Sequence, residues 1–518
     1  MPLARPAPVT PVTTVAAGVT SADDLPPDAS GRFLGTVLSA TVIAGVGLLA
    51  AMVLGAARQV VVGRAMGPIG LGVIGLAESI ENVLIRIAPL GLTASIPLLV
   101  SKRLAAGGQA EAGRLLGTGT VLGLGLAAAA AVVAAIVALP MSALAGGPDT
   151  LPTLVSWAVV IFGLTVCQVA ASGLRGLLSI ASATVVRDVL PNFLVLGFVV
   201  VGLGVGLGLP EIALVYGCGA VVAAGFGLWL VWRAAGRGGL GFAFEPAGIG
   251  PLLALSLPVL LIAASGQLIR QINVPVLAAS TDLATVGEFT AALMFASAVE
   301  GVFIALNLVY LPLASRALAT DGPARIAALQ PAVGRWTALA TLGPVLFLVI
   351  LAEPVVDFLF GPAFAGAAVA IRIICVGLLV QAVIGPRNAI LLALGAARQV
   401  TVAFMAALGV VLATSLVLIP VFGLAGAAVS FASGTVTRSL LAWLFLSRSL
   451  SGAEPRAREL AALVIVPFVA LGPSLAGPVG PALAAGAAIL VVVVLFGSRD
   501  DVDRFVVGEA RRRLRQRR

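Results

Sequence analysis

The sequence predicts an all-α polytopic membrane protein with about 14 transmembrane helices. Of its 518 residues, 60% are hydrophobic and 10% are charged, whereas soluble domains average about 25% charged residues. The mean hydropathy is +1.14. A chain of this composition needs the bilayer as its solvent, because it has too little polar surface to cover a water-soluble fold.

Fourteen apolar stretches account for the predicted helices. A helix needs about 20 apolar residues to cross the hydrocarbon layer, and the last two stretches are short and interrupted by Pro and Gly. The predicted spans are 34–57, 69–99, 115–139, 153–174, 188–208, 212–232, 250–275, 284–312, 335–352, 367–386, 400–420, 424–446, 461–476 and 479–497.

Positive charge alternates from loop to loop along these spans. One set of loops carries Lys102, Arg103, Arg114, Arg175, Arg187, Arg233, Arg237, Arg316, Arg325, Arg335, Arg387, Arg398, Arg448, Arg456 and Arg458. The intervening loops carry Asp149, Glu211, Asp282, Glu353 and Asp357 and essentially no Lys or Arg. Retained positive charge marks cytoplasmic loops. We therefore expect a multi-pass protein of the cell membrane with both termini in the cytoplasm. The net charge of +9 is then explained by the orientation of the protein in the membrane and by contact with anionic lipid headgroups. It does not indicate binding to nucleic acid.

Weak internal repetition divides the chain into two halves. Gly173-Leu-Arg-Gly recurs as Gly385-Pro-Arg-Asn, 212 residues later. Such repeats predict two parallel six-helix lobes with a site between them. The expected parts are a disordered cytoplasmic tail, an N-lobe, a C-lobe, two C-terminal helices and a basic cytoplasmic tail, at residues 1–32, 33–245, 246–450, 451–498 and 499–518.

Several classes of function are disfavoured by what the sequence lacks. It has no histidine and no Gly-x-x-x-x-Gly-Lys-Ser/Thr loop, and its three cysteines lie inside apolar spans. We therefore expect no cofactor, no metal site and no ATP hydrolysis. A membrane-embedded glycosyltransferase is also disfavoured, because such enzymes typically carry a large outer loop. The chain is expected to be a transporter and not an enzyme.

Polar side chains within the spans mark the candidate site, because each charge in the hydrocarbon costs several kcal/mol unless it has a partner or water. Residues spaced by four share one helical face, which groups Glu78, Asn82 and Arg86 in the second span. The candidates for substrate contact are Arg58, Arg86, Arg270, Gln267, Gln271 and Asn82. The candidates for ion coupling or charge compensation are Glu78, Glu81 and Glu300.

Arginine suits phosphate, because its planar fork donates paired, charge-assisted hydrogen bonds and stays ionised. A cavity with Arg58, Arg86 and Arg270 beside amides is typical of a site for a pyrophosphate that carries sugars. The plainer alternative is that Arg86 and Arg270 pair with Glu78, Glu81 or Glu300. Arg64 is expected to reach the outer headgroups. The five tryptophans are expected at the membrane interfaces, and they are Trp157, Trp229, Trp232, Trp336 and Trp443.

Two stretches resemble a known family. The run from Leu54 to Pro68, and the later stretch from Phe358 through Leu391 to the run that begins at Ile419, are similar to segments of the oligosaccharide flippases of the multidrug/oligosaccharidyl-lipid/polysaccharide (MOP) exporter superfamily. The resemblance implies two six-helix lobes in a V plus two C-terminal helices, and alternating-access flipping of polyprenyl-pyrophosphate-linked oligosaccharide.

Within that superfamily, Arg58, Arg64 and the Asn82-x-x-x-Arg86 unit resemble the lipid II flippases, which implies a cavity role for Arg58 and Arg86. The seventh and eighth spans look more like Wzx-type polysaccharide flippases. Our leading hypothesis is a Wzx-type flippase acting in surface polysaccharide biosynthesis. Its expected partners are lipid-linked oligosaccharide, membrane lipids and polymerase or ligase machinery, and it is expected to be a monomer. Two alternatives stay open: a lipid II flippase for peptidoglycan, and a cation-coupled exporter of a soluble drug or metabolite.

Overall fold

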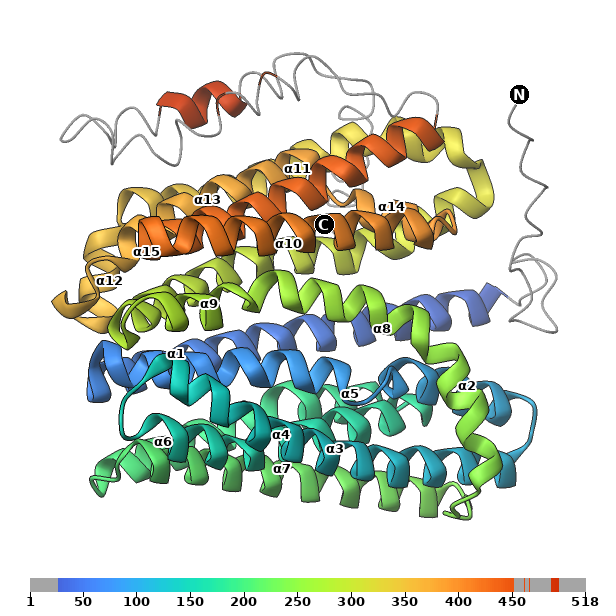
Figure 1. Cartoon of the computed structure of the whole chain (residues 1–518). Helices are drawn as coiled ribbons and strands as arrows, with labels where there is room; N and C mark the ends of the chain where they lie inside the picture. The colour runs from blue at the N-terminus through green and yellow to red at the C-terminus, as the bar shows by residue number, and fades with distance from the viewer. Residues whose placement is uncertain (1–26, 451–460, 462–464, 466–485, 493–518) are drawn as a thin grey trace, which may run out of the picture.

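The protein is helical throughout the part that the computed structural model describes, which is residues 27–450, 461, 465 and 486–492 (Figure 1). That part contains no strand. The helices are α1 (Pro27–Ile87), α2 (Leu92–Ala105), α3 (Gln109–Ala145), α4 (Thr150–Gly176), α5 (Ile180–Thr184), the π-helical η2 (Val185–Val189), α6 (Leu190–Gly204), α7 (Leu209–Arg237), the 3-10 helix η3 (Pro246–Gly248), α8 (Ile249–Gln271), α9 (Asn273–Ser280), α10 (Leu283–Asp321), α11 (Pro323–Ile350), α12 (Ala352–Phe360), the 3-10 helix η4 (Pro362–Phe364), α13 (Ala367–Ile384), α14 (Arg387–Ala393) and α15 (Ala397–Ser449).

Two of these helices reverse direction at a glycine. A straight helix of 61 residues, the length of α1, would measure about 92 Å, about three times the hydrocarbon thickness. Gly67 breaks α1 with φ 68° and ψ −173°, a backbone conformation that glycine adopts at low cost. Gly423, with φ 53°, does the same in α15. Figure 1 shows the chain turning back at the left-hand end of both helices.

The predicted membrane architecture is confirmed in its main features. Ten helices of the described residues are long and apolar enough to cross a membrane. The reversals at Gly67 and Gly423 bring the number of crossings to twelve in this part of the chain. The predicted spans 461–476 and 479–497 lie mostly outside the described residues.

Some predicted boundaries need correction. The first helix continues past residue 57 to Gly67, so Arg58 lies inside the helix and not at its end. The predicted span 69–99 is two helices, because α1 ends at Ile87 and α2 begins at Leu92. Between them lie Pro89, which lacks a backbone donor, and Leu90 and Gly91 with positive φ. The tail predicted for residues 1–32 becomes helical at Pro27. The predicted division at residues 245 and 246 stays a prediction.

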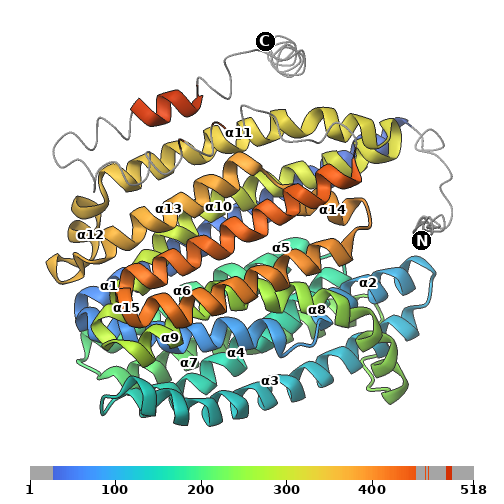
Figure 2. The same ribbon diagram turned by 45° about the horizontal axis from the view of Figure 1, so that its top comes forward.

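The two halves of the chain form two groups of helices. Helices of the first half occupy the lower part of Figure 1 and those of the second half the upper part, with α8 and α9 between them. Figure 2, turned by 45°, keeps α3 and α11 on opposite sides. The two groups share one apolar core, which includes Leu71 and Ile74 of α1, Phe289 of α10 and Phe360 of α12. We call this side, where the chain turns at Gly67, the Gly67 end.

The halves touch backbone to backbone near the Gly67 end. A Cβ added to Gly72 of α1 would collide with the carbonyl of Leu283 at the start of α10, and one added to Gly287 of α10 would collide with the carbonyl of Pro68. Small residues permit such close approach of membrane helices. At the opposite end the buried apolar residues fall into separate clusters, such as that around Leu116 and Leu174 and that around Leu391 and Leu446. The halves are thus joined most tightly at the Gly67 end.

Candidate functional site

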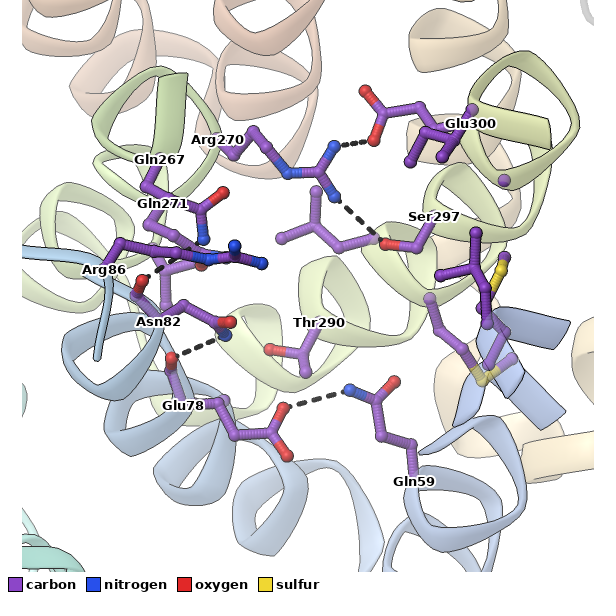
Figure 3. A pocket seen from close by; sticks show the side chains of 18 residues that line it. Gln59, Glu78, Asn82, Arg86, Gln267, Arg270, Gln271, Thr290, Ser297 and Glu300 are labelled. Carbon is purple, nitrogen blue, oxygen red and sulfur yellow. Dashed lines mark hydrogen bonds and ion pairs between the residues drawn. The ribbon is translucent and has the colours of Figure 1, made fainter. Parts of the chain in front are cut away.

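A polar cavity of about 360 Å³ lies between the two halves (Figure 3). It is lined by α1 from the first half and by α8, α9 and α10 from the second. Seven of the nine predicted site residues line it, and they are Glu78, Asn82, Arg86, Gln267, Arg270, Gln271 and Glu300. We call it the central cavity.

Helical spacing explains how these side chains converge. Glu78, Asn82 and Arg86 follow one another at intervals of four in α1 and present one face to the cavity. Arg86 is 19 residues from the turn at Gly67, which places it about 28 Å along the helix from the Gly67 end. Arg270 precedes the turn at Thr281 by 11 residues, about 16 Å of helix. The Cα atoms of the two arginines therefore lie at different depths, and both side chains extend into the same cavity (Figure 3).

Arg270 has a carboxylate partner. Its guanidinium forms an ion pair with Glu300 and donates from Nη2 to Ser297 Oγ at 3.3 Å (Figure 3). Glu300 and Ser297 both lie on α10, one turn apart, so a single helix holds this cation in place. Of the pairings that the sequence left open, the structure has the one between Arg270 and Glu300.

Arg86 differs from Arg270 in having no such partner. The side chain is exposed and lines the central cavity. Within the described part of the chain, no hydrogen bond or ion pair joins it to another residue. Asn82, one turn earlier, does have partners: its side-chain amide donates to the backbone carbonyl of Glu78 at 2.8 Å, and its backbone carbonyl accepts from Gln267 at 3.2 Å. The Arg86 fork is therefore available to an anion in the cavity.

Arg58 faces a second, smaller cavity, within the first half of the chain. Its Nη2 donates to Glu78 Oε1 at 2.6 Å, and its guanidinium lies 4.9 Å from the centre of the Tyr216 ring. Glu78 also accepts from Gln59 at 3.0 Å and from Tyr216 at 3.4 Å. Glu78 therefore compensates Arg58, and neither charge is free for another partner without rearrangement.

Glu81 lies beside this network and is held by a tryptophan. Trp157 of α4 donates from Nε1 to Glu81 Oε2 at 2.7 Å, and its ring lies 4.5 Å from that of Tyr216 of α7. The expectation that Trp157 lies at the membrane interface is wrong, because the side chain is buried. An indole that is buried needs an acceptor for its N–H, and Glu81 is that acceptor.

Removing one member of the Arg58–Glu78 pair is expected to destabilise the protein. Their side chains are 14% and 10% exposed, and leaving one charge of a buried pair alone costs about 3–5 kcal/mol. Arg58→Met should lower the unfolding temperature in detergent strongly, and Arg58→Met combined with Glu78→Leu should recover most of the loss. Equal stability of the single variant and the wild type would show that the pair contributes little.

Arg64 has a role that the sequence did not indicate. It was expected to reach the lipid headgroups, but its Nε donates to the carbonyl of Leu359 at 2.9 Å, and its Nη2 to the carbonyl of Phe358. Both carbonyls belong to the last turn of α12, where unsatisfied carbonyls and the helix dipole favour a cation. Arg64 thus joins the two halves at the Gly67 end. No sequence pattern marks this contact, because its acceptors are backbone atoms.

Comparison with known proteins identifies the fold. No family model matches the chain, and no curated protein matches it. Among solved structures, one similar chain is a multidrug resistance MATE family transporter of the MOP superfamily in an inward-facing conformation, with a TM-score of 0.66 and 16% identity over 78% of this chain and 95% of that one. The lipid II flippase MurJ, in an inward closed conformation, has a TM-score of 0.66 and 12% identity over 88% and 98%.

A third similar structure is a point mutant of the Vibrio cholerae MATE transporter VcmN, with a TM-score of 0.59 and 17% identity over 82% of this chain and 99% of that one. Because these identities are low, the similarity indicates a shared fold and gives no information about the substrate. The chain has the fold shared by the MATE transporters and the lipid II flippase MurJ.

Proposed function

We propose that this protein flips a polyprenyl-(pyro)phosphate-linked oligosaccharide from the cytoplasmic to the outer leaflet by alternating access, for surface polysaccharide biosynthesis. The observation that carries the proposal is Arg86, an exposed guanidinium in the central cavity that the described residues leave without a partner. Arginine binds phosphate through two parallel charge-assisted hydrogen bonds. The amides of Gln267, Gln271 and Asn82 lie around it.

The depths of the arginines support an order of events. With both termini cytoplasmic, the Gly67 end is the outer end, and Arg86 lies near the inner mouth of the cavity. A phosphate that enters from the cytoplasmic leaflet meets Arg86 first and then Arg270, whose Cα lies about 12 Å deeper along the helices. There it competes with Glu300 for the Arg270 guanidinium. Opening of the contacts at Gly72 and Gly287 then exposes the site outside, while the lipid tail stays in the bilayer.

The test is the lipid content of a strain that lacks this protein. Mass spectrometry of polyprenyl-linked sugars should show that a completed lipid-linked oligosaccharide accumulates, and the matching surface polymer should be missing. Expression of the wild-type protein should reverse both changes. An unchanged lipid-linked pool with normal surface glycan, in a strain without a second flippase, would refute the proposal.

Two alternative functions are each favoured by specific observations. The likeness to MurJ favours lipid II as the substrate, in which case depletion should be lethal by lysis; a viable deletion strain with an intact wall would exclude it. The likeness to MATE transporters and the buried carboxylates favour cation-coupled export of a soluble compound. Loss of function in Arg86→Ala and Arg270→Ala, with Glu300→Gln silent, would argue against that exporter.

The proposed setting follows from the same argument. The protein would act in the cell membrane as a monomer without a cofactor, with both termini in the cytoplasm. The machinery that polymerises or ligates the glycan outside would receive the product. The proposed chemistry breaks no covalent bond, since translocation needs only binding and a change in conformation.

A further inference from the structure

The second cavity, which faces Arg58, has a volume of about 250 Å³ and lies inside the first half of the chain. Its walls come from α1, α4, η2, α6 and α7. Gln59, Glu78 and Asn82 line both this cavity and the central cavity. The two cavities are therefore neighbours that share one wall, made by the two segments of α1 on either side of Gly67. We call the second one the side chamber.

The side chamber is lined by amide groups and by charged groups that already have partners, including Glu81, which accepts a hydrogen bond from Trp157. Four amide side chains line it, and each offers both donors and an acceptor: Gln59, Asn82, Gln168 and Asn192. Its two arginines already have carboxylate partners, Arg58 with Glu78 at 2.6 Å and Arg187 with Asp188 at 2.8 Å. A chamber with paired charges and several amides matches a neutral ligand rich in hydroxyl groups better than it matches an anion.

Gln168 lacks a protein partner in the described part of the chain. It lies in the interior of α4, partly buried, and no hydrogen bond joins its amide to another described residue. A polar group away from water costs about 1–3 kcal/mol when nothing pairs with it. The amide therefore needs water or a ligand in the chamber, and a ligand hydroxyl would satisfy it.

The junction between the two cavities sets the distance between ligand groups. Asn82 lines both cavities and lies one helical turn from Arg86, about 6 Å along the axis. A phosphate bound to Arg86 thus has its next substituent beside Asn82 and Glu78. In a lipid-linked oligosaccharide that substituent is the first sugar, which can turn from the central cavity into the side chamber.

We propose that the side chamber binds the sugar nearest the pyrophosphate, with Gln168, Gln59 and Asn82 as hydroxyl partners. This inference rests on the proposed function and adds a glycan subsite to it. The subsite makes the first sugar a determinant of specificity, whereas Arg86 and Arg270 recognise the phosphates that all such substrates share. Later sugars have no contact with the chamber, so glycan length should matter less than the identity of the first sugar.

The test compares the binding of defined lipids to the purified full-length protein. The probes are undecaprenyl pyrophosphate without sugar and the same lipid carrying one glucose, galactose or N-acetylglucosamine. The wild type should bind at least one glycosylated probe about tenfold more tightly than the bare lipid, which corresponds to about 1.4 kcal/mol. In Gln168→Leu the preference should disappear, so that the two probes bind alike.

Controls separate this inference from the proposed function. Gln109→Leu makes the same chemical change at an exposed position at the start of α3 and should keep the preference. Failure of the bare lipid to bind, or binding that is insensitive to Arg86→Gln, would overturn the proposed function. Binding of the bare lipid with no preference for any sugar would overturn the glycan subsite alone. So would a preference that survives in Gln168→Leu and in Gln59→Leu, each shown to be folded by its thermal unfolding.

Discussion

Replacing Arg86 by glutamate is expected to abolish transport while leaving the amount of folded protein nearly unchanged. The guanidinium has no partner in the described part of the chain, so its removal strands no buried carboxylate. The substitution is therefore expected to weaken ligand binding and not the stability of the fold. Deleting one partner of a buried charge pair weakens binding by about 2–5 kcal/mol, which is at least about thirtyfold. Arg86→Lys should retain part of the activity, because the charge survives and the bidentate geometry does not.

Complementation of the deletion strain and binding of undecaprenyl pyrophosphate measure this effect together. Arg398→Glu is the matched control, because Arg398 is also exposed but lies on α15, outside both cavities. It should transport normally. If Arg86→Glu complements as well as the wild type at equal expression, Arg86 does not bind the substrate.

The second large effect is expected from Gly287→Leu. A side chain there would meet the backbone of Pro68 and Gly72, which cannot turn aside as a flexible side chain can. In a helix interior, glycine is less favourable than alanine by roughly 0.8–1 kcal/mol, and leucine ranks close to alanine, so the substitution should not destabilise the helix itself. The variant should fold but fail to close the Gly67 end. Since loading from the cytoplasm requires that closure, transport should fall to background.

Thiol labelling from outside the cell can report this closure. In a Cys218→Ser background, Thr290→Cys places a thiol at a buried position in the cavity wall near the Gly67 end. A membrane-impermeant maleimide should label it in Gly287→Leu and spare it in the parent. Gly125→Leu is the control, because Gly125 has open space around it. Equal protection in Gly287→Leu and its parent would show that the glycine contact does not close the cavity.

Much of the architecture could be predicted because membrane helices leave a strong one-dimensional signal. The length of the apolar stretches located the crossings. The spacing of Glu78, Asn82 and Arg86 placed them on one helical face, and in the structure they line one cavity with Arg270; their role in binding stays a prediction. Helical spacing could not assign partners, because a partner depends on the packing of another helix. Arg58 and Arg270 each turned out to have a carboxylate partner, and Arg86 has none in the described residues.

Other features were hidden for related reasons. The side chamber takes residues from several helices whose order in the sequence does not reveal their contacts, such as Gln168 of α4 and Asn192 of α6. Trp157 lies only a few residues after the predicted start of its span at 153, so its position resembled that of an interfacial residue. Its burial follows from packing against Tyr216 of α7, which hydropathy does not encode.

The contact of Arg64 with α12 has a consequence for how such proteins vary. Because the acceptors are the carbonyls of Phe358 and Leu359, any residue at those two positions supplies them. Substitutions there need no compensating change at position 64. In a comparison of homologous chains, no other position would be expected to vary together with position 64, although Arg64 joins the two halves of the molecule. Methods that infer contacts from paired substitutions would therefore miss this link between the lobes.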